Sequence, residues 1–324
     1  MKYIFHIGAG KTGSSAIQHA LALNESKLSD AGIYLPAENL EDKGNVTGYH
    51  VWWFESIKQM ETVKASEELA SKFVSVVSSA EAKGCNTILF SAENLSNPFS
   101  WSELLKDVLN EHEVQVLIYI RRQDDYLLSA WQQWGIKSGN TLESWMFKHI
   151  GSSGDWSVPI KEWQSIATEE LLVRVYQRDR LRNQDVVDDF FDALDIEASG
   201  FARSNTGVNT SYNIAVEELA LAAPGLFEGP HDNDFFNMVQ KYCKTAHKKL
   251  PGESRLNASE RRSIINRYQQ SNQWIKDQYF KNVNVPLFKM PDTDEYHVAT
   301  KEEIETRKWA VLSELVYGMH KHRN

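Results

Sequence analysis

The sequence predicts an α/β fold in which a central parallel sheet is flanked by helices. Three observations lead to this prediction: short apolar runs separated by helical patterns, a glycine-rich loop directly after the first run, and a strongly helical C-terminal third. Strands that alternate with helices imply a parallel sheet covered on both faces. The expected strands are the four runs rich in β-branched, aromatic or leucine residues, Tyr3–Ile7, Thr87–Phe90, Val114–Ile120 and Leu171–Tyr176.

Helices are expected between these strands and after the last one. Apolar periodicity and a terminating Gly84 predict one over Lys64–Lys83. The others expected in the α/β part are Ala16–Leu23, Trp101–Glu111 and Asp185–Leu194. By contrast, Gly44–Phe54 is rich in glycine and aromatic residues without a clear period, so we expect a binding loop there.

The character of the chain changes at Tyr212. Long helical stretches dominate from there, interrupted by Pro224-Gly225, Gly229-Pro230 and Pro251-Gly252. They are Asn213–Ala223, Phe235–Lys249, Ser259–Tyr279 and Lys301–Tyr317. We therefore expect one domain, 1–324, in which 212–324 forms a mainly helical cap or lid.

Composition narrows the classes of function. The 324 residues include 42% hydrophobic residues, enough for a packed core, and the formal net charge is −9. That charge argues against a broad nucleic-acid surface but leaves room for a local basic pocket. The two cysteines have no metal-ligand spacing, and no apolar run approaches the length of a membrane span. A reducing, cytoplasmic location is therefore expected, and the oligomeric state is left open.

The segment Gly8–Ser15 (GAGKTGSS) joins the first strand to the first helix. Glycines let several backbone N–H groups approach an anion, and the helix N-terminus adds its positive dipole end. Gly10 and Gly13 shape the turn, Lys11 supplies a charge, and the hydroxyl donors are Thr12, Ser14 and Ser15. A Walker A motif would need glycine at position 5, where Phe5 stands. The pattern predicts a three-layer P-loop-type fold that binds phosphate; the alternative is a tight turn with an exposed lysine.

A second anion motif follows the strand Val114–Ile120. Arg121 lies directly after that strand, where its planar guanidinium suits phosphate, and Ser129 lies eight residues further on. Ser129 is expected in the first turns of the next helix, pointing toward the same anion. The alternative is that Arg121 and the adjacent Arg122 are surface arginines that pair with Asp124 and Asp125.

Together the two motifs resemble the sulfotransferase family that uses PAPS (3′-phosphoadenosine 5′-phosphosulfate), most closely its bacterial carbohydrate-type domains. GAGKTGSS matches the family's 5′-phosphosulfate loop, and RRQDDYLLS matches its 3′-phosphate motif, with the arginine at Arg121 and an aspartate at Asp125. The resemblance implies PAPS, or its desulfated form PAP (3′-phosphoadenosine 5′-phosphate), as co-substrate, with no metal. Two departures are Ser14-Ser15 in place of the commoner threonine pair and the lack of a tryptophan after the loop to pack on adenine.

The resemblance also implies roles for other residues. Lys11 would stabilise charge on the leaving group, and Glu93, just past the second predicted strand, would be the base that deprotonates a hydroxyl acceptor. His50 is the second candidate base, and Asn209 and Ser211 are candidate ligands of the 3′-phosphate or ribose.

The expected function is therefore sulfuryl transfer from PAPS to a hydroxyl of a small molecule or glycan, by an in-line reaction with a carboxylate base. Two alternatives stay open. One is a P-loop nucleotide kinase or phosphotransferase, which would need a strand-end aspartate for magnesium. The other is a protein that binds PAP without catalysis.

Overall fold

The computed structural model describes residues 1–36, 49–203 and 212–322. The chain divides into two compact units, each made of three segments. Unit 1 comprises 1–121, 156–208 and 271–287, and unit 2 comprises 122–155, 209–270 and 288–324. The region predicted as a cap, 212–324, falls mainly in unit 2, which also holds 122–155, whereas 271–287 belongs to unit 1.

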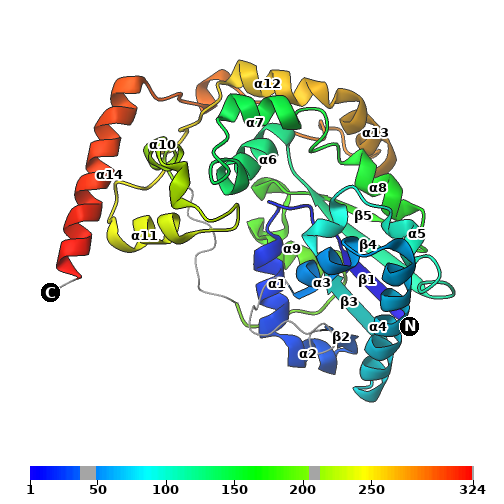
Figure 1. The fold of residues 1–324 in the computed structure, drawn as a ribbon. Helices are drawn as coiled ribbons and strands as arrows, with labels where there is room; N and C mark the ends of the chain where they lie inside the picture. Colours follow the sequence, from blue (N-terminus) through cyan, green and yellow to red (C-terminus); the bar gives the residue numbers. More distant parts are fainter. Residues whose placement is uncertain (37–48, 204–211, 323–324) are drawn as a thin grey trace. The chain divides into compact units, whose positions relative to one another are not determined.

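Unit 1 is built on a five-stranded sheet in which all strands are parallel, in the order β2-β3-β1-β4-β5 (Figure 1). The strands are β1 Lys2–His6, β2 Ile33–Tyr34, β3 Thr87–Ser91, β4 Glu113–Ile120 and β5 Leu172–Val175. The predicted α/β class and the four predicted strands are confirmed within one residue at each end. The strand β2 was not predicted, because two residues are too few to carry a periodic pattern.

Helices cover both faces of this sheet (Figure 1). On one face Ile4 of β1 packs with Ile17 of α1 (Ser14–Leu23) and Phe190 of α9 (Val186–Ala193). On the other face Phe5 stacks on Phe90 and contacts Trp163 of α8 (Ser157–Gln164). This alternation follows from the period of two along a strand. The helices of unit 1 are α1 Ser14–Leu23, α2 Glu25–Asp30, α3 Tyr49–Lys58, α4 Thr62–Ala82, α5 Trp101–Leu105, α8 Ser157–Gln164, α9 Val186–Ala193 and most of α13 Gln269–Tyr279.

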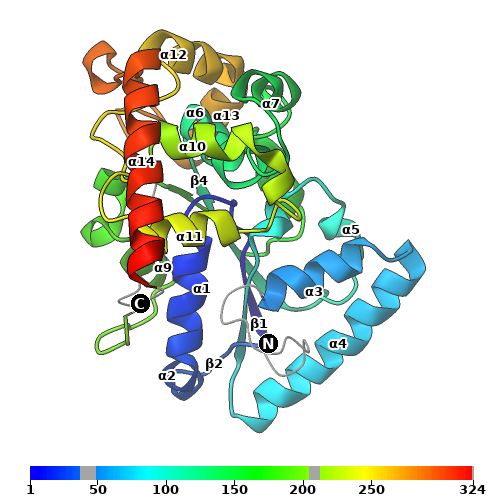
Figure 2. The same cartoon turned by 60° about the vertical axis from the view of Figure 1, so that its left-hand side comes forward.

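Unit 2 is helical. Its helices are α6 Gln123–Ala130, followed by a π-helical turn over Trp131–Gly135, α7 Leu142–His149, α10 Ile214–Ala222, α11 Asp234–Tyr242, α12 Ala258–Arg267 and α14 Lys301–Lys321. Figure 2 shows α14 beside α10 and α11, and its buried residues Val311 and Leu315 share a core cluster with Val216 and Val239 of those helices.

Five predicted segments were wrong in extent, one of them because α14 continues past Tyr317 to Lys321. The expected loop Gly44–Phe54 is helical from Tyr49, because Trp53 and Phe54 join the aromatic core around Phe90. The helix expected over Trp101–Glu111 ends at Leu105, and that over Ser259–Tyr279 divides at Tyr268. The helix expected over Phe235–Lys249 ends at Tyr242.

The early end of α11 has a visible cause. Glu314 of α14 accepts hydrogen bonds from three successive backbone N–H groups, those of Lys244, Thr245 and Ala246. These N–H groups are therefore turned away from a helical pattern, which needs each of them to donate to the carbonyl four residues earlier.

Among the helices of the described residues, none is long and apolar enough to cross a membrane.

Candidate functional site

The carboxyl ends of β1, β3 and β4 lie side by side, because these strands are adjacent and parallel. β1 lies between β3 and β4: the chain places β2 and β3 on one side of β1 and then crosses to its other side for β4 and β5, so the strand order reverses at β1. Open parallel sheets bind ligands at such a point, outside the carboxyl ends of the strands. Three predicted site elements follow these strands: the loop Gly8–Ser15, Glu93 and Arg121.

The loop after β1 needs its glycines. Gly8 has φ +102°, and a Cβ atom there would lie 2.8 Å from Cα of Glu93. Gly13 has φ +88°, and a Cβ atom there would lie 2.9 Å from Cγ1 of Val186. Both positions combine a left-handed backbone with a close approach, so a larger residue would strain the loop or displace its neighbours. Lys11 also has a positive φ, 64°.

Two hydroxyl groups hold the loop together. Thr12, which is fully buried, donates from Oγ1 to the carbonyl of Ala9 at 2.5 Å, and Ser14 donates to the same oxygen at 3.1 Å. The N–H of Ala9 in turn donates to the carbonyl of Tyr119 on β4. In this structure the hydroxyl protons of Thr12 and Ser14 therefore stabilise the loop itself. Anion binding would fall to Lys11, to the exposed Ser15 and to backbone N–H groups.

The start of α1 is open to an anion. Gly13 occupies the N-cap position, so no side chain of that residue accepts a hydrogen bond from the first turn. No acidic residue lies in this turn. Uncapped N–H groups at a helix start, together with the helix dipole, favour a negatively charged group there.

Glu93 is held by a residue that the sequence reasoning missed. Gln18 of α1, which is buried, donates from Nε2 to Oε2 of Glu93 at 2.7 Å and to the carbonyl of Ser91 at 3.2 Å. The signal was available: Gln18 is a polar residue between Ile17 and Leu21, on the inward face of an otherwise apolar helix. A buried amide there needs hydrogen-bond partners, and Glu93 is one of them.

Arg121 lies against the loop. Its Nη1 donates to the carbonyl of Lys11 at 2.8 Å, and its guanidinium lies 5.7 Å from the ring centre of Tyr176. The carbonyl of Arg121 accepts from the indole N–H of Trp156 at 2.7 Å. The first predicted anion motif and the arginine of the second therefore meet within unit 1.

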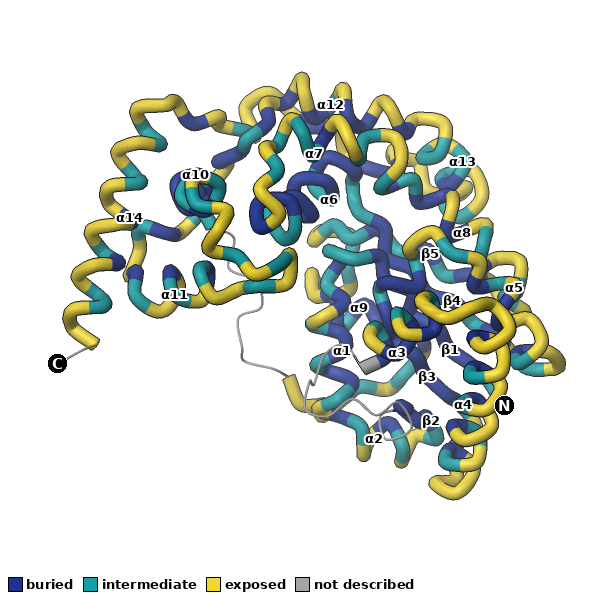
Figure 3. The backbone as a smooth tube through the Cα atoms, viewed as in Figure 1, coloured by how far each residue is buried: buried dark blue, intermediate teal, exposed yellow. Residues whose placement is uncertain are grey.

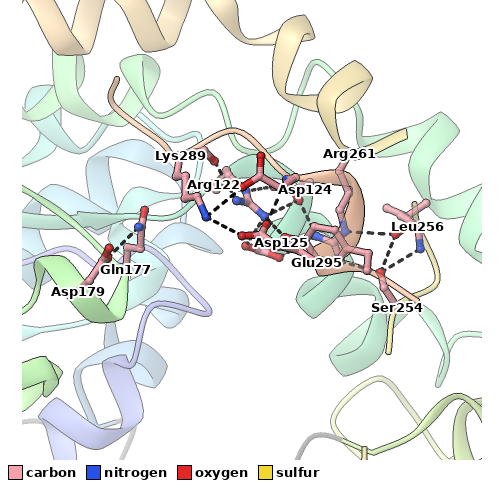
Figure 4. A network of polar contacts seen from close by, with 12 residues as sticks. Arg122, Asp124, Asp125, Gln177, Asp179, Ser254, Leu256, Arg261, Lys289 and Glu295 are labelled. Carbon is pink, nitrogen blue, oxygen red and sulfur yellow. Dashed lines mark hydrogen bonds and ion pairs between the residues drawn. The ribbon is translucent and has the colours of Figure 1, made fainter. Parts of the chain in front are cut away.

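Arg122, unlike Arg121, pairs with Asp124 and Asp125, as the alternative prediction for the two arginines had it. In unit 2 its Nε donates to Oδ1 of Asp124 at 2.6 Å, and its Nη2 also contacts Asp125 at 3.1 Å (Figure 4). Arg261 reaches the same two carboxylates, at 2.5 and 2.8 Å, and lies 4.1 Å from the ring centre of Tyr296. Asp124 is fully buried, so this cluster neutralises an interior charge.

His50, the second candidate base, is a core residue, and so is His6 on β1. His50 accepts at Nδ1 from the N–H of Ser91 at 2.7 Å, so its Nε2 carries the proton donated to the carbonyl of Pro36 at 2.9 Å. Burial lowers the pKa of His50 to about 4, although these backbone hydrogen bonds act in the opposite direction. His6 contacts the hydroxyl of Ser91 at 2.8 Å, and burial lowers its pKa to about 3. Since both ring nitrogens of His50 are engaged, the geometry favours Glu93 over His50 as a base.

The remaining predicted ligands are not brought together by the structure. Ser129 lies on α6 in unit 2, half-buried, whereas Arg121 belongs to unit 1, so their joint anion site stays a prediction. Asn209 and Ser211 lie outside the described residues. Within the described part of the chain, no cluster of three or more His, Cys, Asp or Glu side chains is arranged to hold a metal ion.

Comparisons with protein-family models, with curated proteins and with solved structures found no match.

Proposed function

We propose that this protein is a PAPS-dependent sulfotransferase of P-loop-type fold that transfers a sulfuryl group to a hydroxyl acceptor, with a carbohydrate as the favoured acceptor class. One observation carries the proposal: Lys11, Glu93 and Arg121 follow three adjacent parallel strands and all contact or adjoin the same glycine-rich loop. A cation, a carboxylate and a second cation at one sheet edge suit the transfer of an anionic group to a neutral hydroxyl.

The residues present fit a 5′-phosphosulfate. Lys11 and Arg121 supply positive charge at the loop, and the glycine N-cap leaves the start of α1 without a side chain that competes for its N–H groups. Phosphate can be held without a metal where enough such donors converge. The loop after β1 is not followed by a tryptophan that packs on adenine. The half-buried Tyr176, beside Arg121 in the same unit, offers an aromatic surface for that role.

Bound PAPS would supply the sulfuryl group. Oε1 of Glu93 accepts the proton of the acceptor hydroxyl while Gln18 holds Oε2. The acceptor oxygen forms a bond to sulfur as the bond from sulfur to the phosphate oxygen breaks, and PAP departs with the electron pair of that bond. Lys11 stabilises the charge that develops on this phosphate oxygen.

The kinase alternative is less well supported by the strand ends. β3 and β4 are followed by Glu93 and Arg121, and Glu93 already accepts from Gln18. A magnesium-bound nucleotide would call for an aspartate at such a position. The two cysteines, Cys85 and Cys243, are unpaired and buried, in keeping with the proposed reducing, cytoplasmic location.

A thermal-shift titration with PAP, AMP and ATP, each with and without magnesium, tests the proposal. Ligands that bind the folded state raise its melting temperature in proportion to the logarithm of their concentration. We expect a magnesium-independent rise that is specific to PAP. A rise with magnesium-ATP alone would favour the kinase, and PAP binding without transfer across a broad panel of hydroxyl acceptors would favour the binding protein.

A further inference from the structure

One face of α14 is apolar and exposed. Trp309 and Val316 are each 68% exposed and Leu312 is 39% exposed. These residues are spaced by three and four positions, so they line one side of the helix. Glu305 and His320, both exposed, extend the same line by four residues at each end. We name Glu305, Trp309, Leu312, Val316 and His320 the α14 stripe.

The stripe does not belong to the core of unit 2. α14 buries a different side, through Val311 and Leu315, against α10 and α11 (Figures 2 and 3). The helix itself is well defined, because Thr300 and Glu303 form a capping box at its start. A tryptophan that is two-thirds exposed next to two other exposed apolar side chains on a stable helix marks an interaction surface.

The order of residues along the stripe shows which partner fits. We lay a second copy of α14 antiparallel on the first so that the stripes of the two copies overlap along their whole length. In this alignment two residues face each other when their numbers add up to 625. Trp309 then faces Val316, and Leu312 faces Ser313. At the ends, Glu305 faces His320, and the acidic first turn with Glu302 and Glu303 lies toward the end that carries Lys321.

We propose that the α14 stripe is the interface of a homodimer in which two copies of this chain pair through antiparallel α14 helices. The contact is isologous, as in most two-fold dimers, since the same residues serve on both sides. The helix dipoles also oppose each other favourably in this arrangement. From 305 to 320 the stripe is about 22 Å long, so the interface is smaller than the standard size and a concentration-dependent dimer is expected.

Sedimentation velocity of the full chain from about 1 to 200 µM tests this proposal, since weak interfaces dissociate in that range. We expect the wild type to move from monomer to dimer. Trp309→Glu should raise the dissociation constant at least tenfold, as expected for loss of a central aromatic anchor. Val74→Glu is the matched control, because Val74 on α4 is also 68% exposed and should leave dimerisation unchanged. A wild type that stays monomeric throughout overturns the proposal, including the case in which it binds lipid vesicles instead.

Cysteine cross-linking tests the direction of the helices. Cys85 and Cys243 are buried, so an added surface thiol reacts selectively. Ser313→Cys places two thiols near the two-fold axis and should give a covalent dimer on oxidation or with a short bis-maleimide. Two Glu305→Cys thiols would lie about 22 Å apart and should not cross-link, whereas a mixture of Glu305→Cys and His320→Cys chains should. Cross-linking of Glu305→Cys chains with one another, with no cross-link between Glu305→Cys and His320→Cys chains in the mixture, overturns the antiparallel arrangement.

Discussion

Gln18 donates a hydrogen bond of 2.7 Å to Oε2 of Glu93, and the same amide group donates to the carbonyl of Ser91 at the end of β3. The amide thereby ties the carboxylate to the strand end. Gln18 comes from the helix that the glycine-rich loop begins, so the loop and the carboxylate are fixed by one rigid element. In the proposed reaction this makes Gln18 a positioning residue, whose effect passes through Glu93.

Replacing Gln18 should therefore slow turnover without weakening the binding of PAP. Gln18→Leu removes a hydrogen bond to a charged group, worth about 1.5–3 kcal/mol, so kcat should fall about tenfold or more. The thermal shift with PAP should be retained, and Gln18→Leu should have little further effect when Glu93 is already glutamine. Equal losses in both backgrounds would show that Gln18 acts only on stability.

Glu93→Gln should abolish most transfer. A side chain that acts as a general base contributes about 10²- to 10⁴-fold, and glutamine keeps the size of glutamate while losing the ability to accept the proton. Affinity for PAP, measured by calorimetry, should be nearly unchanged. Glu55→Gln is the control, since Glu55 accepts a hydrogen bond from Asn94, the next residue of the same turn. If Glu93→Gln retains near wild-type turnover, Glu93 is not the base.

Lys11→Ala should reduce turnover about 10²-fold or more, because it removes the charge that stabilises the leaving group. PAP affinity should fall several-fold, since the backbone N–H groups and Arg121 remain. Lys106→Ala, at an exposed position after α5, controls for loss of one positive charge. The measurements are single-turnover rates with excess enzyme and a PAP titration. If both variants behave alike, the loop does not face the reacting group.

Alanine substitutions of the two adjacent arginines should have different effects, on PAP binding at Arg121 and on stability at Arg122. Arg121→Ala should weaken PAP binding at least tenfold with little change in melting temperature. Arg122→Ala leaves the fully buried Asp124 with Arg261 as its remaining guanidinium partner, and loss of one partner from a buried ion pair costs about 3–5 kcal/mol. A well-folded Arg122→Ala protein that no longer binds PAP would shift the anion site to Arg122.

The sheet, its parallel sense and the glycine-rich loop could be predicted because β-branched runs and a Gly-Lys-Ser cluster are local signals. The strand β2 and the helical start of α3 could not, since a two-residue strand has no period and α3 forms because Trp53 and Phe54 pack against Phe90. The contacts of Gln18 with Glu93 and of Glu314 with Thr245 join residues about 70 positions apart. Such pairs follow from the tertiary fold and leave no spacing in the sequence.

Acid should destabilise the fold through His50. Burial lowers its pKa to about 4, so between about pH 6.5 and 4 the unfolded chain binds a proton that the folded chain does not. The free energy of unfolding should therefore decrease as the pH is lowered through this window, by about 1.4 kcal/mol per pH unit for this residue. Urea unfolding of the wild type and of His50→Gln at several pH values tests this, with His231→Gln, at an exposed position, as the control. Parallel pH dependences of wild type and His50→Gln would contradict it.

The division into two units has a consequence for how the chain can be made and dissected. The polypeptide passes from one unit to the other five times, at 121/122, 155/156, 208/209, 270/271 and 287/288. No single cut yields either unit, so deletion series and terminal truncations would remove parts of both. On the ribosome, unit 1 cannot be complete until 271–287 has emerged, which delays closure of its core to the last part of synthesis.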